Sequence, residues 1–475
     1  MTGINLNTNK LIGDIRFWLI LFLFIRFIGI TNPPLETNHN WRQTTVTMVA
    51  RNFFEIDNNI LYPRIDICGD KSGITGMEFP LLNYLIYVMS EILGYEHWYG
   101  RVINLIVSTL GLLFFYKLLS NYFVERIAFN STIVLTVSIW FQFSRKIMPD
   151  TFSMSLMIGS LYYGLNYLEN KSKKYTKLNL LFYFLLMTGG ILSKLPSGYL
   201  LIIFSLFYLR KDILMKRKII LAVVTLLGFF PIIGWYYHWV PKLVEQYGCW
   251  HFFMGKSFVQ GFNEILANLG STAKKFYDTA LKFIGFGLFL YGLFNSIQYK
   301  DKYIYLIFLI SFLGFLVVIF KAGYNFPHHN YYIIPFVPVM ALVAGYGIAN
   351  INNKKLSLFL LLAVSVEGIA AQQHDFRVKE KKMQLLHLES DLNKVSNRND
   401  LVVINSGNYP TPMYFAHRKG WIKNNKKISN SAHIKKLRSK GLKFIVILKN
   451  SFGSRIDLTN YKKVFENDSY AIYKL

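Results

Sequence analysis

Apolar residues fall into long runs along most of the chain, and short polar loops separate these runs. Runs of about 17–25 apolar residues are long enough to cross a bilayer as helices. Basic residues precede the first run and no small-residue cleavage site follows it, so we expect a retained anchor instead of a cleaved signal peptide. The pattern predicts about eleven spans, several of them short, at 14–31, 101–119, 127–143, 151–168, 178–193, 197–209, 219–238, 282–298, 303–320, 331–349 and 355–371.

Two further helices are predicted between the first two runs, in residues 32–100. Apolar side chains recur at helical spacing through residues 40–54, which indicates an amphipathic helix lying on the membrane surface. After Pro80 the chain stays apolar for about 14 residues, which is short for a span. We therefore expect a second interfacial helix there.

From residue 373 the pattern changes to short β-rich stretches that alternate with helical ones. Strands are predicted at 401–405, 444–448 and 469–475, and helical stretches at 409–417 and 431–441. This alternation is typical of a small α/β domain. The expected fold is an all-α polytopic membrane domain, residues 1–372, followed by a soluble α/β domain, residues 373–475.

Composition supports a membrane protein and indicates its orientation. The 475 residues are 53% hydrophobic and 17% charged, with a net charge of +27. This apolar content excludes a disordered chain, and it is too high for a soluble nucleic-acid-binding protein. If the N-terminus is cytoplasmic, most of the inner loops carry the excess of lysine and arginine that cytoplasmic loops show. These loops are 120–126, which lacks the excess, and 169–177, 210–218, 299–302 and 350–354. The C-terminal domain then lies outside, with 21 Lys/Arg against 8 Asp/Glu.

Several motifs are missing from the sequence. It has no Walker motif for ATP, no Asp-x-Asp in an inner loop for a metal-bound nucleotide sugar, and no zinc-type spacing. No spacing demands a metal, although a pair of carboxylates leaves a divalent ion open. Cys68 and Cys249 both fall on the predicted outer face, where a disulfide can form. Their spacing does not show pairing, and we expect two free thiols.

Acidic residues are scarce, and two of them stand at the starts of predicted helices. Glu78 precedes Pro80 at the start of the second interfacial helix, and Asp150 follows KIMP at the outer end of a span. An acid in either place favours the helix dipole, which is a structural explanation. The functional explanation is a carboxylate at the membrane surface that acts as a general base or orients an acceptor.

The predicted outer face also collects cations and polar aromatic residues. Cations and hydroxyls bind phosphate oxygens, although a belt of interfacial aromatic residues explains the tyrosines equally well. The residues are Arg42, Arg51, Arg64, Arg101, Arg145, Lys146, Lys194, Lys321, His328, His329, Tyr331 and Tyr332.

Over about residues 15–350 the chain resembles the GT-C membrane glycosyltransferases. Within them it is most similar to glycosyltransferase family 39, which includes the protein O-mannosyltransferases and the lipid A aminoarabinose transferase, and to a WRQ-containing bacterial subgroup. The similar stretches, in order, are NHNWRQTTVTMVARNF (38–53), MEFPLLNYLIYVMSEILG (77–94), Arg101, MPD (148–150) and HHNYYIIPFVP (328–338).

The resemblance implies a reaction, a donor and a location. A sugar would pass, with inversion, from a polyprenyl-phosphate donor to a lipid, glycan or protein acceptor on the outer face of a bacterial inner membrane. The residues implied in binding the donor lipid and its phosphate are Arg42, Arg101, Lys146, Lys321, His329, Tyr331 and Tyr332.

The chain departs from the family pattern at one functional position. Many members carry an Asp-Glu pair where this chain has Arg42-Gln43, so the family's catalytic acid does not carry over. We therefore expect Glu78 to act as general base or to orient the acceptor, with Asp150 and Asp66 as the next candidates.

Two other classes of function remain open from the sequence. A lipid or solute transporter, or a flippase, would move its substrate without covalent change. A non-catalytic scaffold of glycan assembly would hold partners through the basic C-terminal domain.

Overall fold

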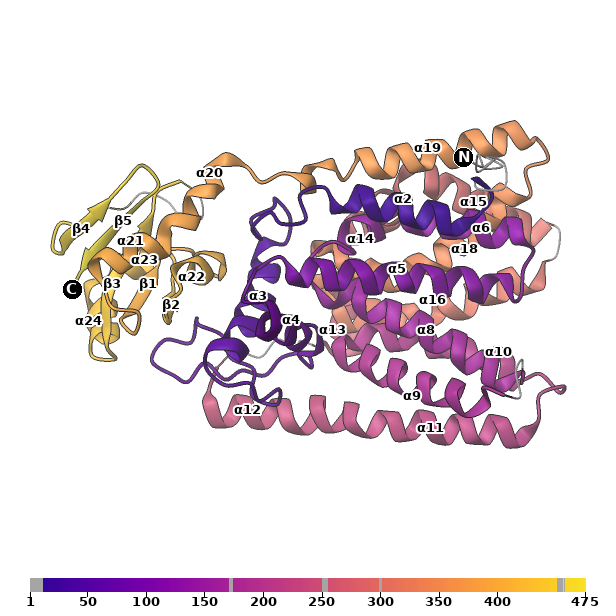
Figure 1. Ribbon diagram of the computed structural model, residues 1–475, viewed down its shortest axis with the longest axis horizontal. Coiled ribbons are helices and arrows are strands. Elements are labelled where there is room, and N and C mark those ends of the chain that lie inside the picture. Colours follow the sequence, from indigo (N-terminus) through magenta and orange to yellow (C-terminus); the bar gives the residue numbers. More distant parts are fainter. Residues whose placement is uncertain (1–11, 171–173, 250–254, 299–300, 451–455, 457) are drawn as a thin grey trace, which may run out of the picture. The chain divides into compact units, whose positions relative to one another are not determined.

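The computed structural model describes residues 12–170, 174–249, 255–298, 301–450, 456 and 458–475. Each predicted apolar run is helical, which confirms the helical membrane domain, and a small sheet forms near the C-terminus (Figure 1). The chain divides into two compact units. The first unit comprises Met1–Ile30, Arg101–Trp235 and Met254–Gln373, and the second comprises Thr31–Gly100, Tyr236–Phe253 and His374–Leu475.

The first unit is a bundle of helices. In Figure 1, α8, α9 and α11 run side by side through it. Its helices are α2 (Ile15–Phe27), α5 (Tyr99–Ser120), α6 (Glu125–Val137), α7 (Ile139–Phe143), α8 (Pro149–Leu168), α9 (Thr176–Ser193), η1 (Leu195–Ile203), α10 (Phe204–Tyr208), α11 (Met215–Ile233), α13 (Phe258–Leu266), α14 (Leu269–Lys274), η3 (Lys275–Ala280), α15 (Lys282–Gln298), α16 (Lys302–Ala322), α17 (Asn325–His328), η4 (Asn330–Phe336), α18 (Val337–Ala349) and α19 (Lys354–Ala370).

Small residues let the helices of this bundle approach closely. A side chain at Gly345 of α18 would overlap Ser131 of α6, and one at Gly292 of α15 would overlap the carbonyl group of Val343. Such contacts bring helix backbones together where lipid gives no hydrophobic drive for association.

Some predicted runs are broken in the structure. The run 127–143 is interrupted at Ser138, whose hydroxyl accepts a hydrogen bond from the Trp140 N–H at 3.1 Å and so begins α7. The run 331–349 starts as the 3₁₀ helix η4, which contains Pro335. Regular α-helix is thus interrupted at a hydroxyl in one predicted run and preceded by a proline-containing 3₁₀ helix in the other.

The number of spans stays a prediction. By length and composition alone, five helices within the described residues are apolar and long enough to cross a membrane, or six if one bent pair counts as a single span. Several other predicted spans are shorter helices, and α4, at 13 residues, is short as expected for an interfacial helix.

The second unit combines the segment after α2 with the C-terminal domain. Its sheet has the order β2-β1-β3-β5-β4 within the described residues, with β2, β1 and β3 parallel and β5 and β4 antiparallel to their neighbours. Its elements are α3 (Asn40–Glu55), α4 (Leu81–Leu93), α12 (Val240–Tyr247), η5 (Gln373–Phe376), α20 (Glu380–Met383), η6 (Gln384–His387), α21 (Leu388–Val395), β1 (Leu401–Ile404), α22 (Thr411–Ala416), β2 (Gly420–Ile422), α23 (Asn425–Ile428), α24 (Ser431–Arg438), β3 (Leu442–Leu448), β4 (Lys462–Glu466) and β5 (Tyr470–Lys474), and the π-helix η2 (Gly234–Trp239) leads into α12.

Helices cover both faces of this sheet. One face packs against α3, α21 and α22, and the other packs against α23 and α24. The predicted amphipathic helix 40–54 is α3, and its apolar residues Met48, Val49 and Phe53 lie in the first of these two cores. The apolar face that was expected to rest on the membrane therefore packs against the C-terminal domain.

Cys68 and Cys249 form a disulfide, with their Cα atoms 5.8 Å apart. This corrects the expectation of two free thiols. The two cysteines are 181 residues apart in the sequence, and they meet because residues 236–253 belong to the second unit.

Candidate functional site

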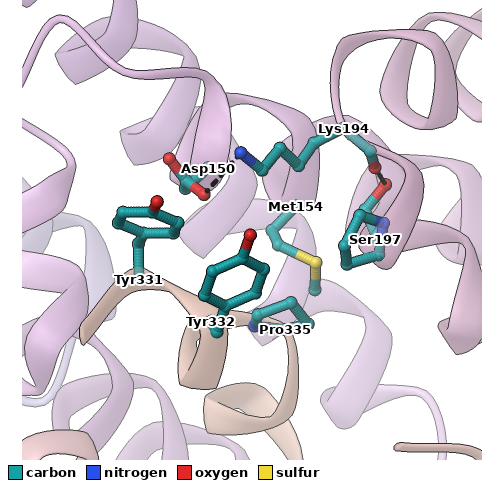
Figure 2. Close-up of a pocket in the computed structure, with 8 residues that line it drawn as sticks. Asp150, Met154, Lys194, Ser197, Tyr331, Tyr332 and Pro335 are labelled. Atoms are coloured by element: carbon teal, nitrogen blue, oxygen red, sulfur yellow. Dashed lines mark hydrogen bonds and ion pairs between the residues drawn. The ribbon is translucent and has the colours of Figure 1, made fainter. Parts of the chain in front are cut away.

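A buried ion pair in the first unit is the centre of the candidate site. The Lys194 ammonium lies 3.6 Å from a carboxylate oxygen of Asp150, and both side chains are largely buried. Tyr331 lies beside the pair, because the Lys194 Nζ is 5.1 Å from the centre of its ring. Figure 2 shows the hydroxyls of Tyr331 and Tyr332 on the side that faces Asp150 and Lys194.

The local sequence places each of these side chains. Pro149 opens α8 after an extended Met148, which puts Asp150 in the first turn, where a carboxylate favours the helix dipole. Lys194 is the extended residue that ends α9, and Pro196 follows it at the start of η1. The structural explanation of Asp150 as a helix-start acid is therefore correct, and the same position brings it to Lys194.

The niche around this pair is small. It is lined by Asp150, Met154, Lys194, Pro196, Ser197, Tyr331, Tyr332 and Pro335, and about 10 Å³ is open to the centre of a water-sized sphere. That is roughly the room one water molecule needs. The niche thus combines one cation, one carboxylate and two phenols. The ammonium and the phenols are donors suited to phosphate oxygens, and the carboxylate is an acceptor suited to a hydroxyl group.

Asn104 of α5 supports the turn that leads to Asp150. Its side-chain amide donates to the carbonyl oxygens of Phe143, Lys146 and Met148 at 2.9, 2.8 and 3.2 Å. Its side-chain oxygen accepts from the Thr151 hydroxyl at 3.2 Å. The amide therefore fixes the backbone before Asp150 and contacts the side chain of the residue after it, a role that sequence reasoning missed.

The predicted phosphate-binding cations Arg101 and Lys146 are buried in the first unit. The Arg101 guanidinium donates to the Ile30 carbonyl at 3.1 Å, and Arg145 donates to the Ile28 carbonyl. Both arginines therefore bind carbonyls just beyond the C-terminal end of α2, where the helix dipole favours positive charge.

A third buried arginine was missed by sequence reasoning. Arg26 of α2 is fully buried and donates to the Ser144 hydroxyl at 2.9 Å and the Thr109 hydroxyl at 3.2 Å. An arginine inside an apolar run was the available signal, because such residues face the interior of a helix bundle.

Of the predicted donor-binding residues from 321 to 332, the structure brings only some to the niche. The His329 ring stacks on Tyr331 with ring centres 5.3 Å apart, so it lies beside the niche. Lys321 lies elsewhere in the first unit, at the end of α16, where its ammonium donates to the Lys256 carbonyl at 2.9 Å.

The remaining predicted residues lie in the second unit. Arg42 and Glu78 form an ion pair, with side-chain exposures of 5% and 13%. The neighbouring Gln43 amide donates to Glu36 at 2.9 Å. Arg42 and Gln43, where the chain departs from the pattern that it resembles, therefore each bind a carboxylate, one of which is Glu78.

Asp66 is held by α3. Its two carboxylate oxygens accept from Arg51 at 2.9 Å and from the Asn52 amide at 2.8 Å. These contacts tie the loop that follows α3 back to the helix. They make Asp66 a structural residue and a weaker candidate for proton transfer than Glu78.

His417 ties α3 to the C-terminal domain within the second unit. Its ring nitrogens lie 2.6 Å from Glu389 and 2.9 Å from Glu55. Burial lowers the pKa of His417, but the hydrogen bonds to Glu389 and Glu55 outweigh it and hold the pKa above its ordinary value of 6.5. Burial likewise raises the pKa of Glu55, yet the hydrogen bond and charge of His417 bring it below 4.5.

Within the described residues, no group of three or more histidine, cysteine, aspartate or glutamate side chains is arranged to hold a metal ion. Asp150 and Glu78 each face a cation, which is Lys194 in the first unit and Arg42 in the second.

Comparison with solved structures identifies the fold. ArnT from Cupriavidus metallidurans in the apo state matches with a TM-score of 0.59 and 12% identity, over 96% of this chain and 97% of that one. The same protein bound to undecaprenyl phosphate matches with a TM-score of 0.57 and 11% identity, over 96% and 98% of the two chains. AglB, an oligosaccharyltransferase from Archaeoglobus fulgidus in complex with an inhibitory peptide and a dolichol-phosphate, gives 0.51 and 13%, over 91% and 69%.

The chain therefore has the GT-C fold of membrane glycosyltransferases, as its resemblance predicted. The family model described as dolichyl-phosphate-mannose-protein mannosyltransferase matches residues 77–235, about a third of the chain. The matched segment contains Glu78, Asp150 and Lys194. A search of curated proteins found no match.

Proposed function

We propose that this protein is an inverting membrane glycosyltransferase that moves a sugar from a polyprenyl-phosphate donor to a lipid, glycan or protein acceptor. The observation that carries the proposal is the niche of Asp150, Lys194, Tyr331 and Tyr332 in a chain with the GT-C fold. Solved proteins of this fold bind undecaprenyl phosphate and dolichol-phosphate, which supports a lipid-linked donor.

The chemistry assigns a role to each group. The acceptor hydroxyl oxygen attacks the anomeric carbon, and the bond from that carbon to the phosphate oxygen breaks. The electron pair of this bond leaves with the polyprenyl phosphate, whose growing negative charge is stabilised by the Lys194 ammonium and the tyrosine hydroxyls. A carboxylate accepts the proton of the acceptor hydroxyl, and a single displacement inverts the configuration.

Glu78 is the proposed general base, since its side chain keeps more exposure than that of Asp150. The pairing with Arg42 orients this carboxylate. A positioned general base contributes roughly 10²–10⁴-fold to a rate, so Glu78→Gln should lower transfer by about that factor with the fold intact.

The proposed location is the bacterial inner membrane, with the N-terminus cytoplasmic and the second unit outside. The Cys68–Cys249 disulfide supports an outer position for the second unit, because disulfides persist in oxidising compartments. The lysine- and arginine-rich loops between the predicted spans support a cytoplasmic position for those loops.

The test is transfer by the purified protein from a labelled polyprenyl-phosphate sugar to membrane extract. The proposal predicts a labelled covalent product that the Glu78→Gln variant does not form at a comparable rate. Movement of the labelled lipid across a vesicle membrane without a product would favour a flippase. The absence of both a product and lipid movement would favour a scaffold.

A further inference from the structure

The strongest charge asymmetry in the molecule lies in the C-terminal domain. Residues 401–450 contain eleven lysines and arginines and no aspartate or glutamate. Six of these cations come from the segment that forms α23 and α24, and here they are called the basic layer. The basic layer consists of Lys423, Lys426, Lys427, Lys435, Lys436 and Arg438.

The fold turns the basic layer outward. Ile428 of α23 and Ile434 and Leu437 of α24 pack into the core on one face of the sheet. The lysines at 426, 427, 435 and 436 and Arg438 lie on the opposite side of these helices and are exposed. Packing of the apolar residues therefore fixes the cations on one outer surface.

The cations of the basic layer have few acidic neighbours. Among the described residues no carboxylate lies within 4.0 Å of any of the six, whereas Lys443 and Lys440 just beyond them contact Asp400 and Asp70. His433 lies among them: burial, together with the charges of Lys423, Lys427 and Lys436, lowers its pKa. Their mutual repulsion is therefore not balanced within the layer, which favours binding of an anion.

The basic layer lies on a different face of the sheet from α3. The sheet packs on α3 with one face, and the basic layer covers the other face. Along the chain, α3 and α4 fall between α2 and α5, whereas α23 and α24 follow the last long apolar helix, α19, by more than 50 residues. The layer is thus distant in sequence from the apolar helices, which favours an anionic polymer as its ligand over a lipid head group.

We propose that the basic layer binds an extended polyanionic glycan, one that carries phosphate or carboxylate groups along its length. Lysines bind such groups as mobile point charges that tolerate variable spacing, in contrast to the fixed fork of arginine. Five of the six cations are lysines, which suits a repeating polymer better than a single, rigidly oriented ligand. This surface goes beyond the proposed transfer reaction and would hold an acceptor or product polymer near the protein.

The test uses the full-length protein in nanodiscs of uncharged lipid, with fluorescent poly(glycerol phosphate) as the probe and neutral dextran as its control. Binding is measured by fluorescence anisotropy without any donor lipid, so failure here leaves the proposed transfer reaction untouched. Wild-type protein should bind the anionic polymer and not dextran. Affinity should fall steeply between about 50 and 200 mM salt, because exposed charges are screened over about 10 Å.

Two variants with the same change of charge separate the basic layer from net charge. The layer variant should bind at least tenfold more weakly than wild type, and the control variant within twofold of it. An equal loss in both variants, or no binding by wild type, overturns the proposal. The layer variant is Lys426→Gln, Lys427→Gln, Lys435→Gln and Lys436→Gln, and the control is Lys379→Gln, Lys381→Gln, Lys462→Gln and Lys463→Gln, all at exposed lysines.

A measurement on the wild-type protein covers the case in which a variant misfolds. Amine-reactive labelling followed by mass spectrometry reports the accessibility of Lys435 and Lys436. The polymer should protect both lysines, and anionic lipid in the nanodisc should not. Protection by anionic lipid but not by the polymer would show that the layer contacts the bilayer, which contradicts the proposal.

Discussion

Lys194 offers the most direct way to separate phosphate binding from charge balance in the niche. Its ammonium lies 3.6 Å from Asp150, a separation worth about 4–5 kcal/mol of attraction at an effective dielectric constant of about 20. Removing one partner of a buried pair typically costs about 3–5 kcal/mol, because the other charge is left without compensation. Lys194→Gln should therefore lower stability by an amount in this range.

The transfer activity of Lys194→Gln should fall for a different reason from its stability. Loss of a group that stabilises the departing phosphate costs roughly 10²–10³-fold in rate. Asp150→Asn combined with Lys194→Gln removes both charges and should recover most of the lost stability. If Lys194 binds the leaving phosphate, the double variant stays at least about 100-fold below wild type.

The assays are thermal unfolding of the purified protein and initial rates of sugar transfer. Lys177→Gln is the matched control, since it changes an exposed lysine at the start of the same helix, α9. Recovery of wild-type rates in the double variant would show that Lys194 only balances Asp150, and this would refute its assignment to the phosphate.

Three further predictions concern contacts that stabilise the two units. Cys68→Ser with Cys249→Ser should lower stability by about 2–4 kcal/mol, seen as a lower unfolding temperature, and wild-type mobility on a gel should change on reduction. Asn104→Ala leaves buried carbonyls without a donor and should cost on the order of 3 kcal/mol. Thermal unfolding measures this loss, and an unfolding temperature equal to that of wild type would contradict it. His417→Gln should reduce stability most between about pH 4.5 and 6.5. The pKa of His417 is raised in the folded protein, so its contribution to stability is complete below pH 6.5 and is lost as pH rises through the folded pKa. The pKa of Glu55 is lowered, so its contribution is lost as pH falls below 4.5. A difference between the unfolding temperatures of wild type and variant that grows above neutral pH would contradict this prediction.

Much of the fold follows from apolar periodicity, because a helix in a membrane must satisfy its own backbone hydrogen bonds. The run 282–298 is α15 with the same boundaries, and 355–371 differs from α19 by one residue at each end. Interruptions of these helices depend on single side chains instead. At Ser138, for example, the hydroxyl accepts a hydrogen bond from a backbone N–H group and competes with the helical hydrogen bonds. The packing of α3 under the C-terminal domain depends on contacts between distant segments, which periodicity does not report.

The candidate site was predictable only in part. Asp150, Tyr331 and Tyr332 were found because they are polar residues at the ends of apolar runs. Lys194 was one of many cations on the predicted outer face, and only the folded chain shows which cation meets Asp150. Asn104 gave no signal, since its role depends on three carbonyls that follow it by about 40 residues.

The central claim is that the protein catalyses covalent sugar transfer from a polyprenyl-phosphate donor. The most direct measurement is the rate at which purified wild type and Glu78→Gln release polyprenyl phosphate from a labelled donor in the presence of membrane acceptor. We expect acceptor-dependent release by wild type and a loss of about 10²–10⁴-fold in the variant. Equal rates in the two proteins would contradict the role of Glu78, and no release by either would contradict the proposed reaction.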